Sequence, residues 1–222
     1  MSLGKKAAIL VGAVILADQI LKIWVKTHMC IEEEISLIGR IGFLYFVENP
    51  GMAFGMEFFG DTGKFLLTLF RMVFTGVLIW FTIKLIREKV PKGLIVGIAF
   101  MIAGAAGNLI DCLFYGVIFS ESTYSSVAQI FPAEGGYAPF MFGNVVDMFY
   151  FPIIKGTWPS WVPGWGGSSF VFFRPIFNIA DAAITVSIIY LLLFQRKPLL
   201  RELSTSNRRK KDEDSSANNN ME

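Results

Sequence analysis

The sequence predicts an almost entirely α-helical membrane protein: a bundle of four transmembrane helices with a small β element outside the membrane. Its composition is the first observation, because 54% of its 222 residues are hydrophobic and its mean hydropathy is +0.54. A soluble domain of this length rarely needs so much apolar surface. The second is a set of apolar runs of about 20 residues, the length that crosses a bilayer. The third is the gathering of basic residues at one side of those runs.

Four segments have the length and composition of a span. We expect them at residues 7–25, 65–86, 94–114 and 176–194. Most Lys and Arg residues lie before the first, in the short turn between the second and third, and after the fourth. By the positive-inside rule, both termini and that turn are cytoplasmic and the two long connections face outward.

The chain is expected to form one membrane domain, residues 1–197, followed by a polar, disordered cytoplasmic tail at 198–222. The outer segment at about 30–60 is rich in β-formers and ends in the turn signal Asn49-Pro50-Gly51, which predicts a small sheet. A long outer loop covers about 115–175. Its tryptophans either anchor it at the membrane interface or pack the loop itself.

Several functions are disfavoured. The net charge of +2 gives no basic field for nucleic acid. His28 is the sole histidine, so a Ser-His-Asp or Cys-His site would depend on one loop residue. The sequence has no zinc motif and no phosphate-binding loop, so neither a metal nor a cofactor is expected.

Ionisable residues within the spans need a partner or a function, because a charge there costs about 2.5–3.5 kcal/mol on insertion scales. Asp18 and Lys22 are four residues apart on one helix face, which predicts a structural ion pair. Arg71 lies within two turns of the outer end of the second span, and we expect it to extend outward as an anchor.

Two further acids share a context. Asn108 precedes Asp111 by three residues, and Asn178 precedes Asp181 by three. Each pair lies on one helix face, and both are expected at the same outer depth. Asp147 follows a short apolar stretch in the outer loop and can fold back to that depth.

Three acids at one level indicate proton chemistry. Two carboxyls that share a site cannot both ionise easily, so one donates a proton while the other takes one from water. This arrangement favours hydrolysis of an amide. A proton-coupled membrane carrier that uses the same acids as a relay remains the alternative, although four spans without an internal repeat are few for a carrier.

Five blocks, in this order, resemble lipoprotein signal peptidase (signal peptidase II), a family of bacterial membrane aspartyl proteases. They are ADQILK at 17–22, ENPGMAFG at 48–55, AGAAGNLIDC at 103–112, GNVVDMF at 143–149 and FNIADAAI at 177–184. The resemblance implies that Asp147 and Asp181 form the catalytic dyad and that Asp18 and Lys22 support the structure. It also implies a set of residues that bind substrate or support the site: Asn49, Asn108, Asp111, Gly143, Asn144 and Asn178.

The resemblance implies an intramembrane aspartic endopeptidase in the bacterial cytoplasmic membrane, with its active site at the outer-leaflet face. Its expected substrate is a prolipoprotein that carries a diacylglyceryl group on its lipobox cysteine, cut just before that cysteine. Membrane lipid is an expected partner, and globomycin-type cyclic peptides are expected inhibitors.

The chain departs from the family's pattern at two places. Cys112 follows Asp111 where the family usually has arginine, which removes a cation near the site. The segment at about 118–141 resembles an inserted outer loop that covers the site.

Overall fold

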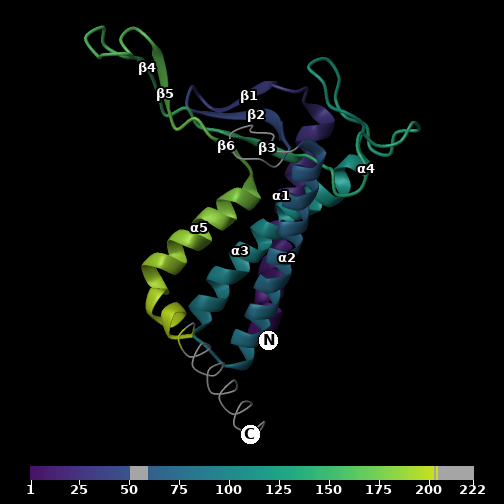
Figure 1. Cartoon of the computed structure of the whole chain (residues 1–222), viewed down its shortest axis with the longest axis vertical. Coiled ribbons are helices and arrows are strands. Elements are labelled where there is room, and N and C mark those ends of the chain that lie inside the picture. The colour runs from purple at the N-terminus through teal and green to yellow at the C-terminus, as the bar shows by residue number, and fades with distance from the viewer. Residues whose placement is uncertain (51–59, 203, 205–222) are drawn as a thin grey trace, which may run out of the picture.

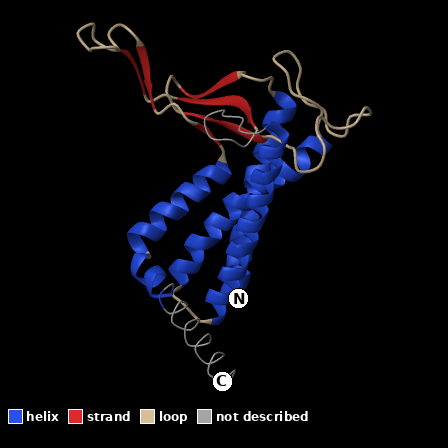
Figure 2. Ribbon diagram, in the orientation of Figure 1, coloured by secondary structure: helices blue, strands red, loops and turns tan. Residues whose placement is uncertain are grey.

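The computed structural model describes residues 1–50, 60–202 and 204, and in it a group of long helices stands beneath a layer of strands (Figures 1 and 2). The third helix is central, because it packs against the other three. The N-terminus and the end of the last long helix lie at the end of the bundle away from the strands. The long helices are α1 (Leu3–His28), α2 (Gly60–Arg87), α3 (Lys92–Ile110) and α5 (Ile179–Phe194).

Three helical segments are long and apolar enough to cross a membrane. They are Leu3–His28, Gly60–Arg87 and Lys92–Ile118, the last made of α3, the π-helical turn η2 (Asp111–Tyr115) and the short α4 (Gly116–Ile118). A fourth candidate combines α5 with the helix Arg196–Glu202, and the two are bent by 87° relative to each other. The three segments match the expected spans, and the fourth span depends on that bent pair.

The expected start of the fourth span at residue 176 was wrong. Ile176–Phe177 form the short strand β6, and α5 begins after Asn178. The Asn178 side chain accepts a hydrogen bond from the backbone N–H of Asp181, whose side chain accepts from that of Asn178, which is a capping box. The residues on both sides of Asn178 are apolar, so hydropathy alone does not mark the start of the helix. The capping side chain of Asn178 determines that start.

The expected tail also begins too early. Residues 196–202 are helical, so the first residues of the segment 198–222 do not fit a disordered tail. The rest of that segment, residue 203 and residues 205–222, lies outside the described residues.

An antiparallel sheet covers the end of the bundle opposite the N-terminus. Its strand order is β1-β2-β3-β6, with β1 (Glu34–Ile38), β2 (Gly42–Asn49) and β3 (Val145–Tyr150). The sequence predicted the β1–β2 part. It missed β3 and β6, which come from the other outer connection and bring residue 147 beside β2. Asn49 is the last residue of β2, and Gly51 of the expected turn lies outside the described residues.

A second two-stranded sheet forms an arm on the long connection between α4 and α5. Its strands are β4 (Ile154–Thr157) and β5 (Ser169–Phe172), and Trp158, Trp161 and Trp165 lie between them. Trp161 is 79% exposed and Trp165 is 65% exposed. In Figure 1 this hairpin extends from the four-stranded sheet away from the helices.

The apolar core has two clusters. The first joins α1, α2, α3 and α5 around Leu85, Leu94 and Ile98. The second joins the C-terminal end of α1 to the four-stranded sheet and to the connection after α4, through Val25, Phe46 and other side chains. Along α1, the buried charges Asp18 and Lys22 lie between the residues that contribute to these clusters.

Candidate active site

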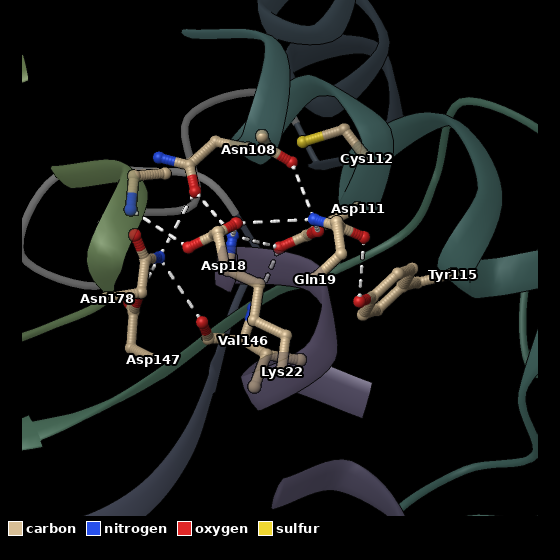
Figure 3. Close-up of polar contacts among 12 residues, drawn as sticks. Asp18, Gln19, Lys22, Asn108, Asp111, Cys112, Tyr115, Val146, Asp147 and Asn178 are labelled. Atoms are coloured by element: carbon tan, nitrogen blue, oxygen red, sulfur yellow. Dashed lines mark hydrogen bonds and ion pairs between the residues drawn. The ribbon is translucent and has the colours of Figure 1, made fainter. Parts of the chain in front are cut away.

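The ammonium of Lys22 is the centre of a buried polar cluster between α1 and α3. It is completely buried and lies 2.8 Å from an oxygen of Asp18 and 2.7 Å from an oxygen of Asp111. It also donates to Oδ1 of Asn108 at 2.8 Å (Figure 3). Lys22 therefore bridges two acids on different helices, where the sequence predicted a local pair with Asp18.

Asp111 supports the sheet from below. Its Oδ2 accepts a hydrogen bond from the backbone N–H of Val146 at 3.3 Å, and its Oδ1 accepts one from Nε2 of Gln19 at 2.9 Å. Gln19 is held in turn by Tyr115, whose hydroxyl donates to Gln19 Oε1 at 3.0 Å. The acid is fully buried, so these bonds replace the water it lost. Asp111 thus fixes the residue that precedes Asp147.

Two asparagines connect Asp147 to Asp181. Nδ2 of Asn178 donates to Oδ1 of Asp147 at 2.7 Å and to Oδ1 of Asn108 at 3.1 Å. Nδ2 of Asn108 donates to Oδ1 of Asp181 at 2.8 Å. The two acids come from β3 and from the first turn of α5, and this chain of amides holds them at one place.

Asp147 is the acid with the clearest shift outside the helices. It is 4% exposed, and burial, followed by the negative charge of Asp181, raises its pKa to about 7. Hydrogen bonds from Asn49 and Asn178 favour the ionised form and limit that rise. Asn49 donates to its Oδ2 at 3.4 Å. An acid of this kind can hold or release a proton near neutral pH.

Two expected residues lie beside this group. The N–H of Gly143 donates to the carbonyl of Cys112 at 2.8 Å, and a Cβ at Gly143 would lie 2.0 Å from the carbonyl oxygen of Asp111. This close approach explains a glycine there. Asn144 contacts Glu48 and Lys64 through its side chain. Neither contact joins these residues directly to Asp147 or Asp181.

The expectation for Arg71 was wrong. Its guanidinium turns toward η2 and donates to Sγ of Cys112 at 2.9 Å, instead of extending outward as an anchor. The prediction that Cys112 leaves this place without a cation is corrected by the same contact. Arg71 of α2 thus brings a cation to Cys112, the residue of η2 that follows Asp111.

Sequence reasoning gave no role to several residues that make buried polar contacts in the structure, among them Gln19, Lys26 and Ser122. Gln19 lies within the quoted ADQILK block, but no role was assigned to it. Lys26 and Ser122 were treated as parts of the outer connections. Burial was the missing signal, because Lys26 is fully buried and Ser122 is 9% exposed. Within the described residues, no group of three or more His, Cys, Asp and Glu side chains is arranged to hold a metal ion.

A cavity of about 350 Å³ opens beside Asp181. Its wall is apolar except for Asp181 and Thr185, and both β6 and the first turns of α5 contribute to it. An apolar cavity that borders a carboxyl group can bind a largely hydrophobic ligand and place one polar group of that ligand beside the carboxyl. The other lining residues are Phe173, Pro175, Phe177, Ala182 and Val186.

Comparison with known proteins decides the family. A family model described as signal peptidase (SPase) II matches residues 10–196. The chain belongs to the signal peptidase II family. It is therefore related to proteases, and the resemblance seen in the five blocks is confirmed.

Individual relatives agree with this assignment. A lipoprotein signal peptidase of Porphyromonas gingivalis is 46% identical over 190 residues, which are 85% of this chain and 82% of that protein. A lipoprotein signal peptidase of Amoebophilus asiaticus is 35% identical over 185 residues, 82% of this chain and 74% of the relative. These signal peptidase II relatives do not favour the carrier alternative.

Solved structures agree on the fold. A bacterial membrane enzyme solved by the in meso method matches with a TM-score of 0.55 at 21% identity, covering 90% of this chain and 91% of that chain. A second structure of the same description has a TM-score of 0.55, also at 21% identity, and covers 85% of this chain. The apolar helices and these neighbours identify a multi-pass membrane protein.

Proposed function

We propose that this signal peptidase II is an aspartic endopeptidase whose catalytic dyad is Asp147 and Asp181. One observation carries the proposal: Asn178 and Asn108 link the two carboxyls, the first by contacting Asp147 and the second by contacting Asp181. The charge of Asp181 also raises the pKa of Asp147, so the two carboxyls are electrostatically coupled and the pair tends to keep one proton. The other buried acids, Asp18 and Asp111, are engaged by Lys22 and so are less able to share that proton.

The chemistry follows from the shared proton. The ionised carboxyl takes a proton from a water molecule, whose oxygen attacks the carbonyl carbon of the scissile amide. The protonated carboxyl, for which Asp147 is suited by its raised pKa of about 7, donates to the carbonyl oxygen. When the tetrahedral intermediate collapses, the C–N bond breaks and the leaving nitrogen takes a proton from the dyad.

The proposed substrate is a prolipoprotein that bears a diacylglyceryl group on its lipobox cysteine, and the bond cut is the one just before that cysteine. The relatives are named lipoprotein signal peptidases. The apolar cavity beside Asp181 has the character that a lipid-bearing peptide needs. Membrane lipid is the proposed second partner, and a globomycin-type cyclic peptide is the proposed inhibitor of the same site.

The proposed location is the bacterial cytoplasmic membrane, with the site at the outer-leaflet face. The basic residues at the start of α1, around the turn between α2 and α3, and after α5 support this orientation. The start of α1 and the turn between α2 and α3 lie at the end of the bundle opposite the sheet. Both termini are then cytoplasmic.

The test is cleavage of a purified, lipidated prolipoprotein, followed as the mass loss of its signal peptide. We expect Asp147→Asn and Asp181→Asn each to abolish cleavage while the protein remains folded and inserted. Glu134→Gln, at an exposed outer-loop residue, is the matched control and should cleave at the wild-type rate. Normal cleavage by either aspartate variant would remove that residue from the dyad.

Asp111→Asn separates the dyad from its support. Because Asp111 contacts Lys22, Gln19 and the backbone of Val146, its replacement should lower stability and reduce cleavage without abolishing it. Complete loss of turnover in a folded Asp111→Asn protein, with activity retained by Asp147→Asn, would assign the dyad to a different pair.

A further inference from the structure

A second buried ion pair lies one helical turn beyond Lys22 on α1. Lys26 is fully buried, and its ammonium pairs with the carboxylate of Glu48 in β2. The same ammonium donates to Oγ of Ser122 at 3.0 Å. It also lies 5.5 Å from the centre of the Phe119 ring and 4.8 Å from that of Tyr137, within the range of cation–π attraction.

The outer loop supplies most of this enclosure. Ser122, Phe119 and Tyr137 all belong to the segment after α4, and the N–H of Ala128 donates to the carbonyl of Lys26 at 3.1 Å. Figure 1 shows this segment beside the outer end of α1. The loop therefore closes over a charge that water would otherwise reach.

Glu48 joins three parts of the chain at one carboxylate. Its Oε1 accepts from Lys26 of α1 and, at 2.7 Å, from Ser122 of the loop. Its Oε2 accepts at 3.0 Å from Nδ2 of Asn144, which directly precedes β3. Both carboxylate oxygens are thus engaged, and the end of β2 is tied to α1, to the loop and to the start of β3.

Asn144 extends the network to α2 and back to the loop. Its Oδ1 accepts from Nζ of Lys64 at 2.6 Å, and its backbone N–H donates to the hydroxyl of Tyr137 at 2.7 Å. In each hydrogen bond of this network, an N–H or O–H donor of one residue meets an oxygen acceptor of another. A polar network satisfied in this way favours one arrangement of the backbone over others.

Glu48 of this network is next in sequence to Asn49, the residue that contacts the candidate catalytic acid Asp147. Asn49 follows Glu48 and donates to Oδ2 of Asp147 at 3.4 Å. In the pairing of β2 with β3, Glu48 lies opposite Val146 and Asn49 lies opposite Val145. The position of Glu48 therefore sets both the amide that contacts Asp147 and the strand residue that precedes it.

A buried ion pair gains little net stability, because desolvating two charges offsets most of their attraction. Its effect on geometry is the better reason for Lys26. We propose that Lys26, paired with Glu48 and enclosed by the outer loop, is a positioning residue that holds Asn49 against Asp147. This inference rests on the proposed catalytic role of Asp147, and it makes the loop a working part of the site.

The test is a double-mutant cycle on kcat and KM for the lipidated prolipoprotein. Lys26→Met and Ser122→Ala are each measured alone and combined with Asn49→Ala, with exposed Glu34→Gln as the control at wild-type activity. Lys26→Met should lower kcat about tenfold or more, because a small misplacement of a reacting group has effects of this order. KM should change by less than about twofold, since the apolar cavity is untouched.

The cycle separates positioning from general destabilisation. If Lys26 acts through Asn49, adding Lys26→Met to Asn49→Ala should lower kcat by less than about twofold further. If the double variant loses kcat by the full product of the two single losses, the inference is overturned. A wild-type kcat in a folded Lys26→Met protein would overturn it as well. If Lys26→Met does not fold, Ser122→Ala and Tyr137→Phe take its place in the cycle, and wild-type kcat in both overturns the inference.

Asp147→Asn distinguishes this failure from failure of the proposed function. A fully active Asp147→Asn protein would reject the dyad itself. An inactive Asp147→Asn protein together with a fully multiplicative cycle would keep the dyad and reject the role of Lys26.

Discussion

Asp147 holds its proton more strongly than an exposed aspartate does. Its surroundings bury it and place the charge of Asp181 nearby, and both effects disfavour the ionised form. Its pKa therefore rises from 3.8 to about 7. Asn49 and Asn178 act in the opposite direction, because an amide N–H binds the ionised carboxylate more strongly than the neutral acid.

This shift predicts the pH dependence of cleavage. As pH rises through about 7, the acid pair loses its shared proton, so kcat/KM should fall on the alkaline side. Asn49→Ala removes a bond that favours the ionised form, so the alkaline limb should move to higher pH even though the rate also falls. Initial rates from about pH 5 to about pH 9 measure both limbs. An unmoved or lower alkaline limb in Asn49→Ala would contradict the prediction.

The same shift has a consequence for stability. A carboxyl whose folded pKa is raised contributes stability that is fully present below about 3.8, the unfolded value, and is lost as pH rises through about 7. Asn at this position has no proton to lose. Asp147→Asn should therefore unfold at a higher temperature than wild type at alkaline pH, with the difference shrinking toward pH 4 or so. Thermal unfolding in detergent measures this, and a pH-independent difference would count against it.

Lys22 is the residue whose loss should cost the most stability. Lys22→Met leaves Asp18 and Asp111 buried without their cation. Breaking a buried ionic cluster by removing one partner destabilises by about 3–5 kcal/mol. Unfolding by denaturant in detergent or bicelles should show a loss of this size, whereas Lys6→Met, at an exposed position of α1, should change little. Equal stabilities for the two variants would mean that the cluster relaxes around the lost charge.

At the level of the elements, close packing of α3 against α5 brings Asn108 to Asp181. Gly104 allows this approach, because a Cβ there would lie 2.2 Å from the carbonyl oxygen of Ala180 and 2.6 Å from Cγ1 of Ile184. The obstacle is partly backbone, so it cannot move aside by a change of rotamer. Ala180 also precedes Asp181, so the helix contact and the candidate site are one structural unit.

Gly104→Ala should consequently separate α3 from α5, lower stability and reduce cleavage through the Asn108–Asp181 bond. Gly76→Ala is the matched control, because a Cβ at Gly76 of α2 would meet nothing within 4 Å. That control should be neutral or more stable by about 0.5–1 kcal/mol from helix propensity alone. Thermal unfolding and kcat of both variants decide the matter. An unaffected Gly104→Ala protein would show that the helices adjust without moving Asp181.

At the scale of the whole molecule, the basic residues at the start of α1 and around the turn between α2 and α3 lie at the opposite end of the helices from the four-stranded sheet (Figure 1). The proposed orientation predicts how single cysteines react with a membrane-impermeant maleimide. In a Cys30→Ser, Cys112→Ser background that still cleaves substrate, Ser125→Cys in the outer loop should be labelled in intact cells. Ser2→Cys should be labelled only after lysis. The reverse pattern would invert the topology and put the acid pair at the cytoplasmic face.

Some contacts in the site were predictable, because they join residues three or four positions apart in the sequence. Asp18 and Lys22 are one turn apart on α1, and the contact between them follows from helix geometry. The link between Asn178 and Asp181 likewise joins residues three apart, as a capping box. The roles of Lys26 and Arg71 were not predictable, because their partners Ser122 and Cys112 lie 96 and 41 residues away along the chain.

The sequence by itself determined the apolar composition, the segments that became α1, α2 and α3, and the ordered blocks that identify the family. These properties can be read from short stretches of the chain, since hydropathy needs a run of about 20 residues and helical spacing about one turn. Tertiary structure alone decided that β3 pairs with β2. It also decided that Lys22 serves two acids and that the outer loop encloses Lys26. Those outcomes depend on burial, which makes an unpaired charge or amide costly and so selects partners from distant parts of the chain.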